Sequence, residues 1–176
     1  SIAPWHAPFL FGDSEEELKP SCHEKLENEA NHVAGQLLFL QDRFSLEAND
    51  MSITLESVRA LSKTFGNTMT STLWRFVEET HPNLPMVGLV ATNPRNRADT
   101  DFQIPRRYCI ESPEFKKRFS STSEPELFDI IAGYCQPRRG GPLGNAEALL
   151  TDNNGDRHVF RFESFSNGYD TLTIGV

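Results

Sequence analysis

Glu27 and Asn31 are the residues of this sequence whose types and spacing best suit a chemical site. They stand one helical turn apart in the segment 22–40, where apolar residues recur at helical spacing and predict a helix with one buried face. Glu27 falls at the border of that face. A glutamate there can complement the helix macrodipole while the asparagine is solvated. It can also be a metal ligand that Asn31 orients, and both interpretations stay open at this point.

The histidines and cysteines are weaker candidates. His6, within PWHAP, could line a cleft, although an ordinary loop histidine is the simpler interpretation. His23 shares a helical face with Glu27, and such a pair either binds an ion weakly or is a solvated contact. His158, at the start of a predicted strand, is expected to be exposed. The three cysteines are widely spaced, without CxxC or a neighbouring base, so we expect reduced thiols rather than disulfides or a nucleophile.

Charge and hydropathy argue against two classes of protein. The formal net charge is −8, and residues 1–50 carry ten acidic against three basic side chains. Affinity for nucleic acid depends on lysine and arginine contacts to phosphates, so DNA is not an expected partner. No stretch approaches the roughly 20 apolar residues of a membrane helix. We expect a cytoplasmic globular protein, of one domain or two small domains sharing a core, that does not span a membrane.

The front half is predicted to be helical. An apolar loop over residues 1–20 leads into the helix of residues 22–40. Two shorter helices should follow, over 54–65 with Thr54 as N-cap and over 70–79.

The turn at Gly66 gives those two helices the outline of a helix-turn-helix. A DNA reader needs basic residues on the second helix, but Arg75 stands alone there against Glu78 and Glu79. The pattern therefore favours a structural helical pair over a DNA-binding motif. A protein-docking surface is the third interpretation.

The back half has a mixed pattern. Strands are predicted over 86–92 and 106–112, helices over 113–119 and 123–135, a loop over 136–145, and a three-stranded antiparallel meander over 146–176. In the meander, Val159, Arg161 and Glu163 alternate with Phe160 and Phe162. The predicted fold class is α+β, with a helical part over 1–81 and an α+β domain over 82–176.

Two segments, LENEANHVAGQLLF and LESVRALSKTFGNTMTSTLWRFVEET, carry a resemblance to a known family. They are similar to the zinc metallopeptidases named after ImmA and IrrE. In that family a helix with HExxH supplies two histidine ligands and the catalytic glutamate, and a later helix with an ExxAN-like signature supplies the third ligand. Glu27, Ala30 and Asn31 occupy those signature positions. Over residues 22–80, the resemblance implies that Glu27 is a zinc ligand, that Asn31 orients it, and that the substrate is a repressor-like regulatory protein.

The sequence departs from the family because it contains no HExxH. The nearest imitation, HEKLE, begins at His23 and places Glu27 where the second histidine should be. Catalytic zinc needs three protein ligands, an open position for water and a carboxylate base, so Glu27 alone cannot hold it. We therefore expect a C-terminal fragment that starts after the HExxH helix, carries no catalytic residue and binds no zinc alone. His6 could line the cleft of the intact enzyme, with an ordinary loop histidine as the simpler interpretation.

A second hypothesis needs no catalysis. A small sheet with helices on its face resembles GAF- and PAS-like ligand modules, and some proteins of the peptidase family carry a GAF-like C-terminal domain. Residues 86–176 would then be a regulatory or ligand-sensing module that binds a protein or a small molecule. The aromatic residues of this half can also be explained simply as core.

Overall fold

The structure, a computed structural model, describes residues 42–93, 106–136 and 138–176. Helices come first within this part of the chain, and strands with further helices follow, which confirms the α+β class. In chain order the elements are α3 (Asp42–Asn49), α4 (Leu55–Phe65), α5 (Met69–Glu79), β1 (Val87–Thr92), β2 (Arg106–Glu111), α6 (Pro113–Arg118), α7 (Glu124–Tyr134), β3 (Gly141–Thr151), β4 (Arg157–Ser166) and β5 (Asp170–Gly175).

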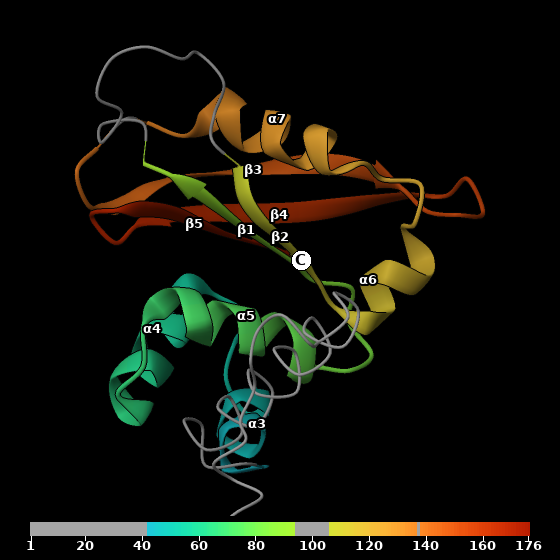
Figure 1. The fold of residues 1–176 in the computed structure, drawn as a ribbon. Coiled ribbons are helices and arrows are strands. Elements are labelled where there is room, and N and C mark those ends of the chain that lie inside the picture. The colour runs from blue at the N-terminus through green and yellow to red at the C-terminus, as the bar shows by residue number, and fades with distance from the viewer. Residues whose placement is uncertain (1–41, 94–105, 137) are drawn as a thin grey trace, which may run out of the picture. The chain divides into compact units, whose positions relative to one another are not determined.

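The strands form one five-stranded antiparallel sheet in the order β2-β1-β5-β4-β3 (Figure 1). The predicted meander of β3, β4 and β5 is confirmed. Its turns use Gly155 and Gly168, whose φ angles of 88° and 101° suit glycine. The strands β1 and β2, far earlier in the chain, extend the meander because β1 pairs with β5.

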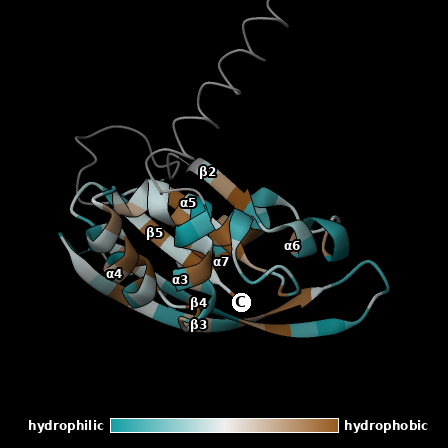
Figure 2. Cartoon of the chain, turned by 90° about the horizontal axis from the view of Figure 1, so that it is seen from below, coloured by the Kyte–Doolittle hydropathy of each residue, from teal (hydrophilic) through white to brown (hydrophobic). Residues whose placement is uncertain are grey.

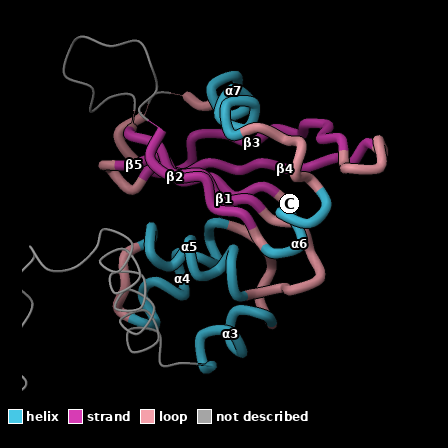
Figure 3. Tube along the Cα trace, turned by 45° about the vertical axis from the view of Figure 1, so that its right-hand side comes forward, coloured by secondary structure: helices cyan, strands magenta, loops and turns pink. Residues whose placement is uncertain are grey.

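Different helices cover the two faces of the sheet (Figures 1 and 3). We call the side under α6 and α7 the α7 face, and the side under α4 and α5 the α4 face; α3 packs against α4 and α5. Side chains alternate along a strand. Phe160 and Phe162 therefore point to the α7 face, whereas Arg161 and Glu163 point to the α4 face.

The core of the α7 face is aromatic. The ring centroids of Phe115, Phe119 and Phe160 lie 5.0 to 5.7 Å apart, the range of favourable ring contacts. Gly175 lets β5 approach Phe162, because an added Cβ would lie 2.5 Å from a ring carbon. Other buried members are Val87, Leu89, Leu127, Phe128, Ile131 and Leu150.

The helices α4 and α5 form as predicted, for local reasons. Thr54 caps α4 by accepting a hydrogen bond from the backbone N–H of Ser57, and Gly66, with φ of 68°, ends it. Thr68 caps α5 in the same way. Their buried faces carry Leu55, Val58, Leu61, Leu73, Phe76 and Val77.

The predicted loop over residues 136–145 is wrong in its second half, because β3 begins at Gly141. Pro142 and Gly144 are tolerated because β3 is an edge strand and its pairing with β4 shifts register between these two residues. Gly144 has φ of 135° and lies against Tyr134 at the end of α7. Proline and glycine mark a bulged edge here.

By their contacts, residues from Asp42 to Val176 form one compact unit, in which α4 and α5 belong with the sheet. The predicted opening loop and the helix over residues 22–40 lie outside the described residues. The division into residues 1–81 and 82–176 stays a prediction for that reason.

Candidate functional site

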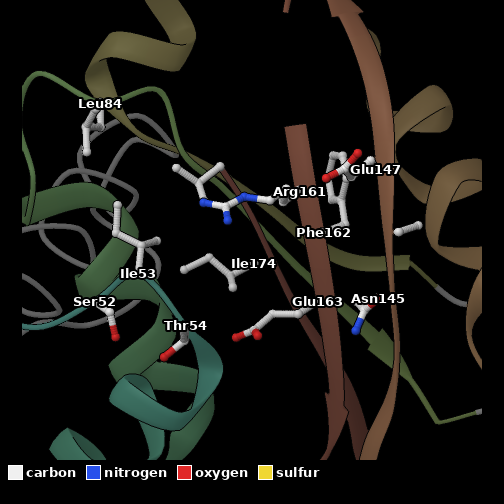
Figure 4. A pocket seen from close by; sticks show the side chains of 12 residues that line it. Ser52, Ile53, Thr54, Leu84, Asn145, Glu147, Arg161, Phe162, Glu163 and Ile174 are labelled. Atoms are coloured by element: carbon white, nitrogen blue, oxygen red, sulfur yellow. The ribbon is translucent and has the colours of Figure 1, made fainter. Parts of the chain in front are cut away.

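A groove of about 800 Å³ lies on the α4 face, between the strands β3 to β5 and the loop that precedes α4 (Figure 4). Its volume is in the range of small-molecule sites. Most of its walls come from the loop before α4, from Leu84 before β1, and from β3, β4 and β5. The residues that matter for its chemistry are Ile53, Leu84, Asn145, Arg161, Glu163 and Ile174.

Hydrogen bonds hold the wall of the groove next to α4. Thr54 Oγ1 accepts from the N–H of Ser57 at 3.2 Å. Glu163 Oε1, reaching across from β4, accepts from the backbone N–H of Leu55, the first residue of α4. A carboxylate there complements the partial positive charge of the helix N-terminus. Glu163 therefore ties α4 to β4.

The floor follows from strand alternation. Arg161 and Glu163 are two residues apart on β4 and share its α4 face. Their cross-strand neighbours on β3 are Glu147 and Asn145, which also line the groove. On β5, Ile174 pairs with Glu163 and is only 1% exposed, so it supplies an apolar base.

The guanidinium of Arg161 has unused binding capacity. Its side chain is exposed and makes no ion pair or hydrogen bond to another residue within the described parts of the chain. Figure 4 shows its guanidinium extending toward the side of Leu84 and Ile53, while Glu163 extends toward Thr54. A guanidinium among aliphatic side chains is suited to binding a planar anion such as a carboxylate.

The described residues that line the groove include no histidine and no cysteine. The hydroxyl of Thr54 is engaged in capping, and Glu163 holds a backbone N–H. The guanidinium of Arg161 beside apolar side chains is suited to binding a ligand.

The sequence-predicted site residues Glu27, Asn31 and His6 all lie outside the described residues. In the described ranges, no group of three or more His, Cys, Asp or Glu side chains could hold a metal ion. Glu27 would supply one of the three protein ligands that catalytic zinc requires. The described residues therefore supply no ligand set for a catalytic zinc ion, and the zinc site predicted at Glu27 stays a prediction.

Asp152 and His158 form a polar cluster that the sequence did not predict. His158, expected to be exposed, is half-buried: its side chain is 34% exposed, and its Nε2 donates to Asp152 Oδ2 at 2.9 Å. Asp152, whose side chain is 5% exposed, also accepts from the N–H groups of Asn154 and Asp156. Burial acts to raise the pKa of Asp152, but these hydrogen bonds outweigh it and hold the pKa below its ordinary value.

The described cysteines are poor nucleophiles. Cys109 and Cys135 are half-buried free thiols. Burial, together with the carboxylates of Glu111 and Glu124, raises the pKa of Cys109 to about 12, and burial raises the pKa of Cys135. Reactivity requires the thiolate, so neither side chain is activated.

Arg75, the one basic residue of α5, is not displayed for DNA. It is 6% exposed, its Nε lies 2.7 Å from Glu79 Oε2, and its guanidinium carbon lies 5.5 Å from the centre of the Phe44 ring. These contacts place it in the packing of the helices. In this helical pair Arg75 acts as a structural residue.

None of the helices in the described part of the chain has the length and apolar character needed to cross a bilayer. No model of a known protein family matches the chain, and no curated protein sequence matches it either.

Proposed function

We propose that residues 42–176 are a ligand-sensing module and that they belong to an ImmA/IrrE-like zinc metalloendopeptidase that acts on a regulatory protein. The observation that carries the sensing role is the groove on the α4 face, with Arg161 and Glu163 over the apolar Ile174. A small antiparallel sheet with helices on its faces also supports a GAF- or PAS-like module. Small-molecule sites of this kind combine an apolar lining with a few polar groups.

The peptidase part rests on the sequence. Glu27, Ala30 and Asn31 match the signature of the third-ligand helix, and α4 and α5 follow in the order that the resemblance implies. The sequence contains no HExxH, so the proposal requires another stretch of polypeptide to supply two histidines and the catalytic glutamate. Glu27 would then be the third zinc ligand.

A second candidate is a protein without catalysis in which the same module binds its ligand. It is favoured by the groove itself, whose described lining offers charged and apolar groups for binding without a metal ion. The two candidates differ in one cheap observation, which is whether the intact protein has an HExxH helix.

The sensing role is tested by filling the groove. Asn145 is exposed on the edge strand and lines the groove, so Asn145→Trp should occupy the groove without entering the core. A ligand that binds only the folded state raises its stability. We expect the low-molecular-mass fraction of a cell extract to raise the urea midpoint of the unmodified protein but not that of the variant. No rise, or an equal rise in both, would contradict the sensing role.

The peptidase role is tested through zinc content. In the intact protein, Glu27→Gln should weaken zinc binding by at least about tenfold, because it replaces a charged ligand. Glu29→Gln, on the same predicted helix but turned away, is the matched control. Zinc per chain is measured after dialysis against a buffered zinc concentration, with circular dichroism to confirm folding. Equal zinc content in both variants would remove Glu27 from the site.

A further inference from the structure

The charges of the groove limit what it can bind. Among the described residues, the side chains that line it carry one guanidinium, that of Arg161, and two carboxylates, those of Glu147 and Glu163. A ligand with several negative charges, such as a nucleotide, would meet an excess of like charge, which opposes binding. A ligand with one negative and one positive group meets a partner for each.

Arg161 and Glu163 are each able to receive such a group. No ion pair or hydrogen bond to a described residue occupies the guanidinium of Arg161. Glu163 uses Oε1 for the N–H of Leu55, and within the described residues no hydrogen bond reaches its second oxygen. A carboxylate on Arg161 and an ammonium on Glu163 would both form charge-assisted hydrogen bonds.

The positions of the two residues on β4 favour an extended ligand over a single amino acid. The Cα atoms of residues i and i+2 on one strand face are roughly 7 Å apart, and the side chains of Arg161 and Glu163 leave β4 from such a pair of positions. The two ends of an extended dipeptide are separated by about 7 Å, whereas those of a single amino acid are separated by about half of that. Ile53, Leu84 and Ile174 lie next to these groups and supply apolar surface for side chains.

We infer that the groove binds a short zwitterionic peptide with apolar side chains, its carboxylate on Arg161 and its ammonium on Glu163. The inference rests on the proposed sensing role of this groove and names its class of ligand.

Four related probes test it by isothermal titration calorimetry on the intact protein: L-leucyl-L-leucine, its N-acetyl derivative, its C-terminal amide, and L-leucine. The acetyl derivative lacks the ammonium, the amide lacks the carboxylate, and leucine is too short. We expect the dipeptide to bind at least about tenfold more tightly than each of the other three, since a charge-assisted hydrogen bond is lost each time.

Two variants test which side chain binds which end of the dipeptide. Arg161→Gln should weaken the affinity for the dipeptide about tenfold and leave the affinity for the amide unchanged, because the amide has no carboxylate that could bind Arg161. Glu163→Gln should weaken the affinity for the dipeptide and leave the affinity for the acetyl derivative unchanged. Arg157→Gln, an exposed arginine at the far end of β4, is the matched control and should change nothing.

Three results would overturn the inference: equal affinity for the dipeptide and a capped derivative, an equal effect of Arg161→Gln on the dipeptide and the amide, or no binding of the dipeptide. Each of these results differs from those that would refute the sensing role. If the sensing role were wrong, the extract would not raise the urea midpoint of the protein, or it would raise the midpoint of Asn145→Trp equally. Because the comparison between probes is made on one folded protein, it does not depend on a variant's stability.

Discussion

Asp152 connects two parts of the fold through one carboxylate. It accepts hydrogen bonds from two backbone N–H groups of the β3–β4 turn and from His158, and Arg118 of α6 lies 3.9 Å away. The neighbouring Asn153 donates to the carbonyl of Arg118 at 2.8 Å. Figure 2 shows that α6 and this turn are mainly hydrophilic at their surfaces. The polar contacts of the cluster add to the packing of Phe115 and Phe119 on Phe160, and both position α6 on the sheet.

Asp152→Asn should therefore destabilise the protein in a pH-dependent way. The pKa of Asp152 is lower in the folded state than in the unfolded chain, so its charge stabilises the fold above the ordinary carboxyl value of 3.8. That contribution is lost as pH falls through the folded value. In urea unfolding, the variant should have a lower free energy of unfolding than the unmodified protein at neutral pH. The difference should shrink as the pH falls below the pKa of Asp152 in the folded state.

Asp156→Asn is the control for that experiment. Asp156 is exposed and contributes its backbone N–H to Asp152, which asparagine retains. Its unfolding midpoint should stay close to that of the unmodified protein. If both variants unfold at the same urea concentration, the carboxylate of Asp152 does not have the role assigned here.

At the scale of elements, the end of α4 depends on one backbone conformation. Gly66 has φ of 68°, and no atom lies within 4 Å of a Cβ built there. The cost of Gly66→Ala is therefore conformational, and we expect a loss of about 1 kcal/mol in the free energy of unfolding. Gly133 in α7 also has open space but lacks a positive φ.

Gly133→Ala should accordingly raise the free energy of unfolding, by about 0.5 kcal/mol. The two substitutions are chemically identical and differ in backbone conformation. Urea unfolding of both variants therefore isolates the contribution of that conformation to the free energy of unfolding. Effects of the same sign would contradict the assigned role of Gly66.

Elements with local signals could be predicted from the sequence. Thr54 and Gly66 delimit α4 through their own capping hydrogen bonds and φ preference, so the limits of this helix follow from neighbouring residues. The pairing of β1 with β5 could not be predicted in this way, since the two strands are about eighty residues apart in the chain. The start of β3 was missed because pairing with β4 overrides the loop-like composition around Pro142.

The groove shows the same limit. Alternation along β4 predicts that Arg161 and Glu163 share one face of a strand. The segment that faces them is set by the tertiary structure, because the loop at Ile53 is about a hundred residues away in the chain. Glu27, Asn31 and His6 lie outside the described residues, so the zinc site stays a prediction.

At the scale of the whole molecule, the two faces of the sheet in the described unit differ. The α7 face is filled by an aromatic core, and the α4 face holds the groove beside the loop before α4. Because Glu163 joins β4 to the first residue of α4, a ligand that engages Glu163 would act on the position of that helix. This connection gives a sensing module a route from ligand to helix.

Methyl NMR spectroscopy tests the central claim most directly, because it shows where a ligand binds. With methyl-labelled protein and the low-molecular-mass fraction of a cell extract, we expect the signals of Ile53 and Ile174 to shift. Those of Leu127 and Ile131, in the core of the α7 face, should stay in place, and Asn145→Trp should abolish the shifts. Unchanged signals of Ile53 and Ile174, or shifts that persist in Asn145→Trp, would contradict a ligand-sensing groove on the α4 face.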